Sequence, residues 1–268
     1  MKTLILDLGS HSIKTYLYDK KIKALKTTTW RILDKKPSEK YIRTNIRSAI
    51  SEYKKSTARI IAVGTAAMRR NVTARKIVER VCTDFNINYQ TLSQRKEAQL
   101  ITKAISAPNV DHIINVGGGS IQIISKDGAE LLLKFGISDL NKKFKLDSEI
   151  KERKISECID WLLKKIKKPL GLFVYTGGEK KYLKKLNCPI YSGFCKKSDF
   201  LKIHKNLMSL TMNELEKLSP NDPKWMSGAI ASNCIVIALL SRSRYKKFIP
   251  SNFNISDGII FHHSKYTF

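Results

Sequence analysis

The sequence predicts an α/β fold built from two related domains, and three observations lead to this prediction. A strand–turn–strand pattern with a glycine-rich turn occurs twice, at residues 5–19 and 113–127. In both halves, apolar runs of strand length alternate with segments of helical periodicity, as in layered α/β proteins. Between the halves, residues 107–109 (APN) interrupt the helical pattern. We therefore expect one domain at residues 1–109 and a second at residues 110–268.

The two copies of the pattern align with an offset of 108 residues (117 − 9). Identical pairs in this alignment include Gly9 and Gly117, Ser12 and Ser120, Ile13 and Ile121, and Asp19 and Asp127. A third strand is expected after each copy, at residues 23–30 and 130–134. The repeat indicates a duplicated domain, with the last helix packing back on the first domain.

The remaining elements follow from periodicity and capping signals. In the first half we expect a helix with Ser38 as N-cap at residues 38–54, a buried strand at 58–63, and helices at 72–85 and 95–105. In the second half we expect a long helix at 148–166, a short strand at 172–175, a helix after Gly178, and an apolar helix at 224–240.

The net charge of +27, from 50 Lys and Arg against 23 Asp and Glu, would attract polyanions. The excess is mainly Lys in a chain also rich in Ile and Asn, which is equally typical of an AT-rich genome, and both interpretations stay open. The lysine pairs are dispersed along the chain, which is typical of solvated faces and not of a nucleic-acid-binding tail. Nucleic acid is therefore not expected as a specific partner.

The cysteines and apolar runs bear on location. Five cysteines without CxxC spacing give no zinc or redox motif and favour a reducing, cytoplasmic setting. Asp7 interrupts the first apolar run too early for a secretory signal, and no run reaches the length of a membrane helix. We expect a cytoplasmic protein without a membrane partner.

The glycine turns are candidates for binding phosphate, because glycine lets several backbone N–H groups approach one oxygen closely. An isolated GGG is usually only a hairpin turn, but three such turns, two of them in repeated positions, favour a phosphate site. The Walker pattern and the dinucleotide-binding GxGxxG pattern are both absent. The candidate phosphate-binding residues in these turns are Gly9, Ser10, Ser12, Gly117, Gly118, Gly119, Ser120, Gly177 and Gly178.

These motifs, in this order, resemble the exopolyphosphatase/guanosine pentaphosphate phosphohydrolase (Ppx/GppA) family nearly end to end. Residues 7–12 (DLGSHS) resemble the family's DxGSNS hairpin, and residues 115–120 (NVGGGS) resemble its DxGGGS hairpin. Other matching segments are 64–71 (GTAAMRRN) to TxxxRxAxN, 93–101 (SQRKEAQLI) to SGxEEARLI, 176–178 to TGG, 227–230 (SGAI) to AGA, and 255–258 (ISDG) to VSxxG.

The resemblance implies two ASKHA domains (actin-like, ribonuclease H-like) flanking a central cleft, in which water cuts the terminal phosphate from polyphosphate or pppGpp with Mg²⁺ or another divalent cation. It implies that Glu97 is the general base, that Asp7 holds the metal with Asn115 as a weaker ligand, and that Arg69 and Arg70 contact phosphate. The alternative for Glu97 is a solvent-facing carboxylate in a first helical turn. A homodimer stays open.

The chain departs from the family pattern at several acidic positions. Asn115 and Gln122 stand where the family has Asp and Glu, and Lys96 replaces the first glutamate of EEA. His11 replaces an Asn, and residues 221–226 and 258–262 diverge from the usual motifs. The leading hypothesis is a phosphohydrolase. The alternatives are a catalytically degraded binder of polyanions or nucleotides, and nucleic-acid binding driven by charge alone, which ranks last because no nucleic-acid-binding module is visible.

Overall fold

The structure is a computed structural model that describes residues 2–32, 38–54, 57–105, 110–148, 150–218 and 223–260. Its contacts divide the chain into an N-terminal unit, Met1–Ser106 with Gly117–Gly119 and Asn254–Phe268, and a C-terminal unit, Ala107–Val116 with Ser120–Phe253. The expected boundary between residues 109 and 110 lies at the edge of a stretch outside the described residues. Among the described helices, none has both the length and the apolar character to span a bilayer.

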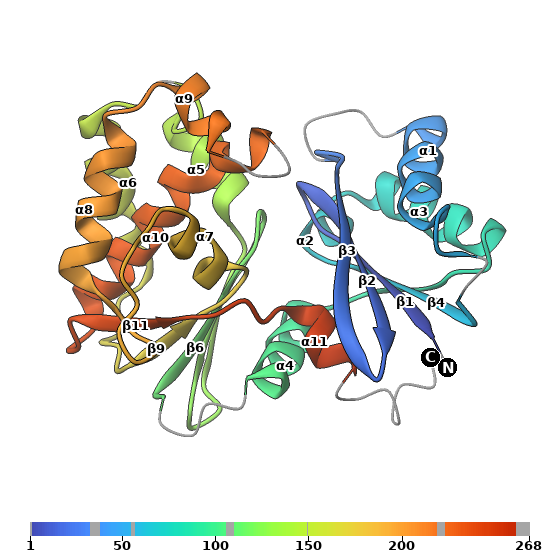
Figure 1. The fold of residues 1–268 in the computed structure, drawn as a ribbon, viewed down its shortest axis with the longest axis horizontal. Helices are drawn as coiled ribbons and strands as arrows, with labels where there is room; N and C mark the ends of the chain where they lie inside the picture. Colours follow the sequence, from blue (N-terminus) through green and yellow to red (C-terminus); the bar gives the residue numbers. More distant parts are fainter. Residues whose placement is uncertain are drawn as a thin grey trace. The chain divides into compact units, whose positions relative to one another are not determined.

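The N-terminal unit contains a five-stranded mixed sheet in the order β3-β2-β1-β4-β5 (Figure 1). Its strands are β1 (Thr3–Leu8), β2 (Ser12–Asp19), β3 (Lys21–Thr29), β4 (Arg59–Gly64) and β5 (Asn88–Thr91). The first three strands form an antiparallel meander, whereas β4 and β5 run parallel to β1.

Helices cover both faces of this sheet (Figure 1). Side chains alternate between the two faces along a strand, so every residue of β1 is buried. Leu4, Leu6 and Leu8 pack into a core with α1 (Glu39–Ile50) and α3 (Val72–Asp84). Ile5 points to the opposite face, where it packs with residues of α4 (Gln94–Ala104) and α11 (Ile255–Ile260). The same alternation places Asp7 on the α4 face. The short helix α2 (Ala66–Arg70) follows β4.

The C-terminal unit repeats this arrangement in a six-stranded sheet of order β10-β11-β9-β6-β7-β8. Its strands are β6 (His112–Val116), β7 (Ile121–Ser125), β8 (Glu130–Leu133), β9 (Phe173–Tyr175), β10 (Cys195–Lys196) and β11 (Lys247–Pro250). Strands β6, β7 and β8 form an antiparallel meander, and β9 and β11 run parallel to β6. Counted from β3 in the first sheet and from β8 in the second, five strands have the same order and directions in both units. This confirms the predicted fold class of duplicated α/β domains.

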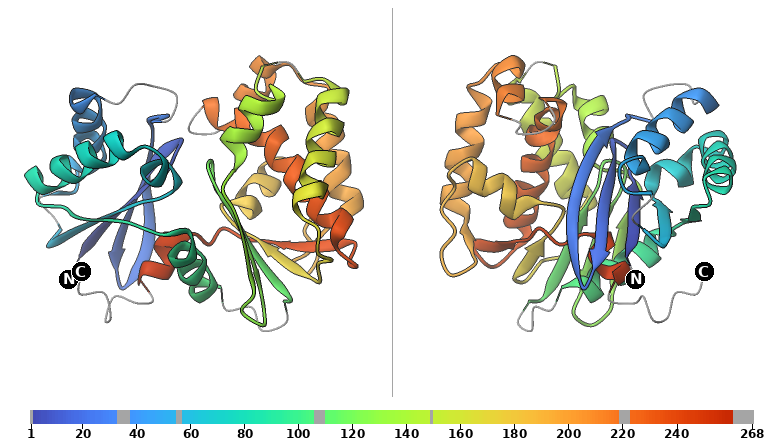
Figure 2. Two further views of the ribbon diagram at one scale, coloured as in Figure 1. Left: turned by 180° about the vertical axis from the view of Figure 1, so that it is seen from behind. Right: turned by 45° about the vertical axis from the view of Figure 1, so that its right-hand side comes forward.

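The helices of the C-terminal unit include a packed layer formed by α6, α8 and α10 (Figure 2). Its described helices are α5 (Ile137–Phe144), α6 (Glu152–Lys165), α7 (Glu179–Lys185), α8 (Lys197–Met208), α9 (Met212–Lys217), the 3₁₀ helix η2 (Pro223–Gly228) and α10 (Ala229–Arg242). Their apolar faces form one core with the inner side of β6, β7 and β9.

Two predicted helices were wrong at their starts. The helix expected at residues 148–166 begins only at Glu152, because Lys151 is its N-cap in extended conformation. The apolar helix expected at 224–240 starts as a 3₁₀ segment through Gly228 and becomes α-helical at Ala229. Gly228 has no room for a side chain there, because a Cβ would lie 2.9 Å from Ile137 Cγ2.

Candidate functional site

The first glycine turn is a closed hairpin loop between β1 and β2. The Gly9 N–H donates to the Ser12 carbonyl at 3.0 Å, and a Cβ on Gly9 would meet the same oxygen at 3.1 Å. Trp30 braces the loop, since its indole Nε1 donates to the Gly9 carbonyl at 2.8 Å and its backbone N–H donates to the His11 carbonyl at 3.0 Å. Ser10 and Ser12 are buried in this turn.

The second glycine turn contributes Gly117–Gly119 to the N-terminal unit, where it lies against the first turn. A Cβ on Gly119 would come within 2.9 Å of the Ala66 Cβ and 3.0 Å of the Ser10 Oγ. The Arg70 guanidinium donates a hydrogen bond to the Gly119 carbonyl. The structure therefore brings together three predicted phosphate-binding residues, Ser10, Arg70 and Gly119.

The backbone amides of Gly117, Gly118 and Gly119 have no hydrogen-bond partner among the described residues. Gly117 and Gly118 are half-buried and Gly119 is buried. Backbone N–H groups that are sheltered from water are nearly always paired, so consecutive free amides beside a guanidinium form a ready site for an anion.

Glu97 lies in the first turn of α4 and is 1 % exposed, so the alternative of a solvent-facing carboxylate is wrong. Arg69 pairs with it through two nitrogens, at 2.8 Å to Oε1 and 3.4 Å to Oε2. Arg69 also donates to the Leu92 carbonyl at 2.7 Å, which fixes the guanidinium. Ser93 caps the helix, because its Oγ accepts the Lys96 N–H at 3.1 Å. Glu97 is thus a buried carboxylate that pairs with the Arg69 guanidinium.

Asp7, at the carboxyl end of β1, is 8 % exposed. Burial raises the pKa of Asp7, and the nearby charge of Lys14 lowers it in part. Lys14 lies directly opposite Asp7 in the register of β1 and β2. A desolvated carboxylate at a strand end is suited to receive a cation, because a cation would stabilise the ionised form.

Asn115 and Gln122 belong to a buried chain of neutral hydrogen bonds in the C-terminal unit. The Thr176 hydroxyl donates to Asn115 Oδ1 at 3.0 Å, and Asn115 Nδ2 donates to Gln122 Oε1 at 2.7 Å. Gln122 Nε2 then donates to the Ser120 hydroxyl at 3.0 Å. Both ends of the Asn115 side-chain amide are engaged, so the two substitutions that remove acid from the family pattern form one connected unit.

The third turn, Thr176–Gly178, has left-handed backbone at Gly177 (φ 101°) and Gly178 (φ 102°), which glycine adopts without strain. The Gly177 N–H donates to the Phe253 carbonyl at 3.3 Å. Gly178 is the N-cap of α7. One of the two predicted phosphate-binding amides of this turn is therefore already used inside the C-terminal unit.

The donor set fits a divalent cation only in part. The described residues contain no group of three or more His, Cys, Asp or Glu side chains that could hold a metal by themselves. Mg²⁺ commonly uses one or two carboxylates and completes its shell with water and substrate phosphates. Asp7 fits that role, whereas the Asn115 oxygen already accepts a hydrogen bond from Thr176.

Glu179 is a buried acid that the sequence did not single out. It follows Gly178, is 5 % exposed, and its Oε1 has no hydrogen-bond partner among the described residues. Burial, with a smaller contribution from Cys188, raises the pKa of Glu179 to about 8. No sequence signal could have found it, because a glutamate in a first helical turn normally faces water.

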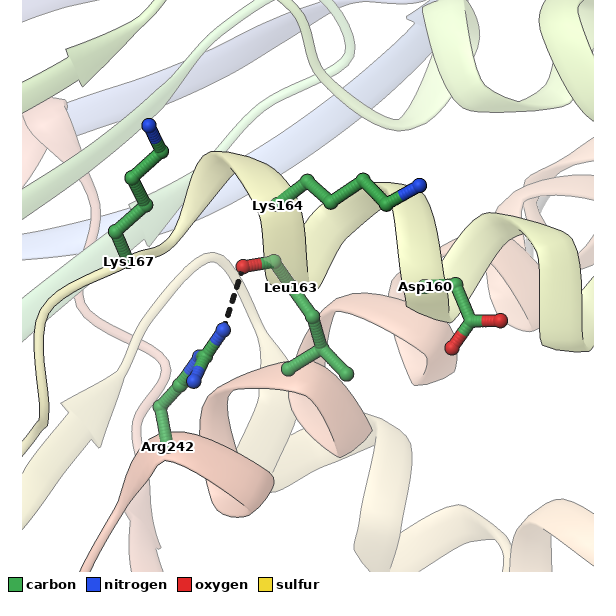
Figure 3. A pocket seen from close by; sticks show the side chains of 5 residues that line it. All are labelled: Asp160, Leu163, Lys164, Lys167 and Arg242. Carbon is green, nitrogen blue, oxygen red and sulfur yellow. Dashed lines mark hydrogen bonds between the residues drawn. The ribbon is translucent and has the colours of Figure 1, made fainter.

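A separate hollow of about 590 Å³ lies at the end of α6 (Figure 3). Its lining includes Lys164, Lys167 and Arg242, and none of the candidate site residues. Arg242 donates to the Leu163 carbonyl at 2.8 Å, which satisfies a carbonyl in the last turn of the helix. Cations at a helix C-terminus stabilise the helix, so the basic side chains around this hollow have a structural explanation.

Comparisons with known proteins identify the family and agree with the fold. The sequence profile of the Ppx/GppA phosphatase family matches residues 34–262. The crystal structure of a Ppx/GppA family member from Aquifex aeolicus superposes with a TM-score of 0.74 at 20 % identity, covering 98 % of this chain and 97 % of that chain. An exopolyphosphatase structure from Cytophaga hutchinsonii superposes with a TM-score of 0.79 at 15 % identity, with the same coverage. Among curated proteins, none matches the sequence significantly.

Proposed function

Because this chain belongs to the Ppx/GppA phosphatase family, we propose that it releases the terminal phosphate of polyphosphate or of a guanosine polyphosphate by attack of water. In this reaction a water oxygen bonds to the terminal phosphorus, the bridging P–O bond breaks, and the proton of the water is taken up by a base. The chain supplies a carboxylate, cations and free amides for these tasks.

The observation that carries the proposal is the ion pair between buried Glu97 and half-buried Arg69. Burying a carboxylate costs free energy that a salt bridge does not reliably recover, so a buried carboxylate paired in this way is a candidate functional group. Arg69 approaches Glu97 Oε1 more closely than Oε2, at 2.8 Å against 3.4 Å. Glu97 would accept the proton of the attacking water, with Arg69 as the residue that orients the carboxylate.

The phosphate would bind at the turns. The free amides of Gly117–Gly119 and the hydroxyl of Ser10 offer neutral donors, and Arg70 offers a charge. Donors fixed in advance around developing negative charge stabilise a transition state without reorganisation. Arg70 would exchange its bond to the Gly119 carbonyl for one to a phosphate oxygen.

Asp7 would hold the divalent cation that the family resemblance implies. When bound, such a cation neutralises phosphoryl oxygens and positions the transferred group. Asp7 would contribute one carboxylate, ionised by the cation's charge despite its burial.

The test is phosphate release from polyphosphate and from pppGpp in the presence of Mg²⁺ or Mn²⁺. Glu97→Gln keeps the shape of the side chain and removes the base, and we expect a loss of about 100-fold or more in the rate. The matched control is Glu79→Gln, which removes an exposed carboxylate from α3 of the same unit. Equal inactivity of wild type and Glu97→Gln with every metal and both substrates would reject the hydrolase.

A second candidate function is binding of polyphosphate or nucleotide without turnover, which the neutral chain of Asn115 and Gln122 favours. This candidate predicts saturable binding together with the absence of phosphate release. The double variant Asn115→Asp with Gln122→Glu should then gain phosphate release. If the double variant still binds the ligand and still fails to release phosphate, these two amides are not the cause of inactivity.

A further inference from the structure

Two cysteine side chains that take no part in the proposed chemistry touch each other in the C-terminal unit. Cys188 follows α7, and Cys195 opens β10. Their Sγ atoms are 3.6 Å apart. Both side chains are free thiols.

A tight hairpin brings the two thiols together. Tyr191 and Phe194 exchange two backbone hydrogen bonds, at 2.8 and 2.9 Å. The two residues between them, Ser192 and Gly193, both have positive φ, at 47° and 87°, which is the signature of a type I′ turn. On the far side, Cys195 pairs with Phe248 of β11, which fixes that end of the hairpin to the sheet.

We propose that Cys188 and Cys195 are a reversible disulfide site that reacts with small disulfide oxidants such as oxidised glutathione. A disulfide bond is about 2.05 Å long, so the sulfur atoms must approach by roughly 1.5 Å. The hairpin between them is short and already formed. The bond would therefore link the end of α7 to the edge strand of the sheet.

The exchange balances with one molecule of oxidised glutathione. The Cys188 thiolate attacks one glutathione sulfur, which forms a mixed disulfide and releases one glutathione thiolate. The Cys195 thiolate then attacks the Cys188 sulfur and displaces the second glutathione thiolate. The two cysteine protons are taken up by the two glutathione thiolates, so two thiols are oxidised and one disulfide is reduced.

Cys188 is the better initial nucleophile of the two. It is 5 % exposed and Cys195 is fully buried. The hydrogen bond with Cys195 lowers the pKa of Cys188, which raises its thiolate fraction. The acidic groups that act on the pair are Glu179 on α7 and Asp199 on α8.

The remaining cysteines provide internal controls. Cys158 on α6 and Cys234 on α10 also form a hydrogen-bonded pair, but both are fully buried within the helix layer. Cys82 is fully buried on α3 of the N-terminal unit. Residues 191–193 of the hairpin are exposed, so local opening gives an oxidant access to Cys188 first.

The experiment treats folded protein with oxidised glutathione, blocks residual thiols by alkylation, and maps the products by mass spectrometry. Trypsin cuts after Lys185 and after Lys196, so one peptide of residues 186–196 carries Cys188 and Cys195 and no other cysteine. We expect this peptide to lose two hydrogen atoms and escape alkylation, while the peptides with Cys82, Cys158 and Cys234 remain alkylated. A reducing agent should restore its alkylation.

The folded hairpin should form the bond about tenfold faster, or more, than the same chain in concentrated urea, because folding raises the effective concentration of one thiol at the other. Cys188→Ser should abolish the oxidised peptide, and Cys82→Ser should retain it. Five alkylatable thiols in the oxidised folded protein, a bond at Cys158–Cys234 instead, or equal rates in urea would each overturn the proposal. The wild-type mapping decides the matter even if a variant fails to fold, and it requires no substrate.

Discussion

At the scale of single residues, the candidate site combines buried acids with buried neutral amides. Glu97 remains as an ionisable group with a fixed cation, at 2.8 Å from Arg69. The side-chain amides of Asn115 and Gln122 bond to each other and to two hydroxyls. Because both side chains are neutral, this buried chain of hydrogen bonds contains no unpaired charge, which would be costly.

Glu179 allows a prediction about pH. Its folded-state pKa of about 8 lies above the ordinary value of 4.5, so folding favours the protonated form. The stability from the neutral side chain is complete below pH 4.5 and is lost as the pH rises to about 8. Glu179→Gln should flatten this slope and stabilise the protein at pH 9 by up to about 5 kcal/mol, at about 1.4 kcal/mol per pKa unit. Urea unfolding across this range measures it.

The control for that series is Glu152→Gln, which changes an exposed glutamate on α6 of the same unit and should leave the slope unchanged. An identical pH slope in wild type and Glu179→Gln would show that other groups determine the pH dependence. Burial also raises the pKa of Asp7 and of Asp257, and these two carboxyl groups would then be candidates.

At the scale of elements, α11 packs against α4 at a glycine. A Cβ on Gly258 would lie 2.6 Å from the Leu100 carbonyl carbon and also collide with its oxygen. Backbone cannot move aside as a side chain can, so Gly258→Ala should destabilise the N-terminal unit by about 2 kcal/mol or more. Urea denaturation followed by circular dichroism measures the change.

Gly193→Ala provides the comparison for this prediction. Gly193 has positive φ, and a Cβ there would meet no atom within 4 Å. Its substitution should therefore lower the free energy of unfolding only by the cost of a left-handed backbone with a side chain, about 1–2 kcal/mol. A Gly258→Ala variant as stable as wild type would show that α11 shifts freely along α4. The packing of Ile255 and Ile259 with Leu100 would then contribute little.

The sequence predicted elements best where local signals were strong. Both hairpins, the Ser38 cap and the strands at residues 58–63 and 172–175 follow from alternation, capping and glycine turns. The start of α6 was misplaced because Lys151 caps it through backbone conformation alone, without a side-chain signal. The pairing of Arg69 with Glu97 joins residues 28 positions apart, so only the folded chain could reveal that Glu97 is buried.

At the scale of the whole molecule, the two units share the order of five strands, and the chain carries a net charge of +27. Such a charge attracts any polyanion, so affinity alone does not identify a specific site. Specific binding at the turns and general attraction to the surface differ in their response to salt and to changes in the turns.

This difference gives a prediction for polyphosphate binding measured by fluorescence anisotropy over a salt series. Gly119→Ala places a Cβ against Ala66 and Ser10, so it should weaken binding about tenfold while leaving the dependence on salt nearly parallel to that of wild type. The control is Gly128→Ala in the turn between β7 and β8, where a Cβ meets no atom within 4 Å and the positive φ of 86° adds only a conformational cost away from the glycine turns. Superimposable binding curves for all three proteins would indicate attraction by charge alone.

The chain of hydrogen bonds through Asn115 and Gln122 has one further property, which concerns its direction. Thr176 stands at one end and Ser120 at the other, and a hydroxyl can donate or accept. If both amides turn over, the same groups form the same number of bonds running the opposite way. A pair of ionised carboxylates could only accept hydrogen bonds, so each neighbouring hydroxyl would have to donate. The amide chain has no such fixed direction, so the donors and acceptors that the two end hydroxyls meet select which way it runs.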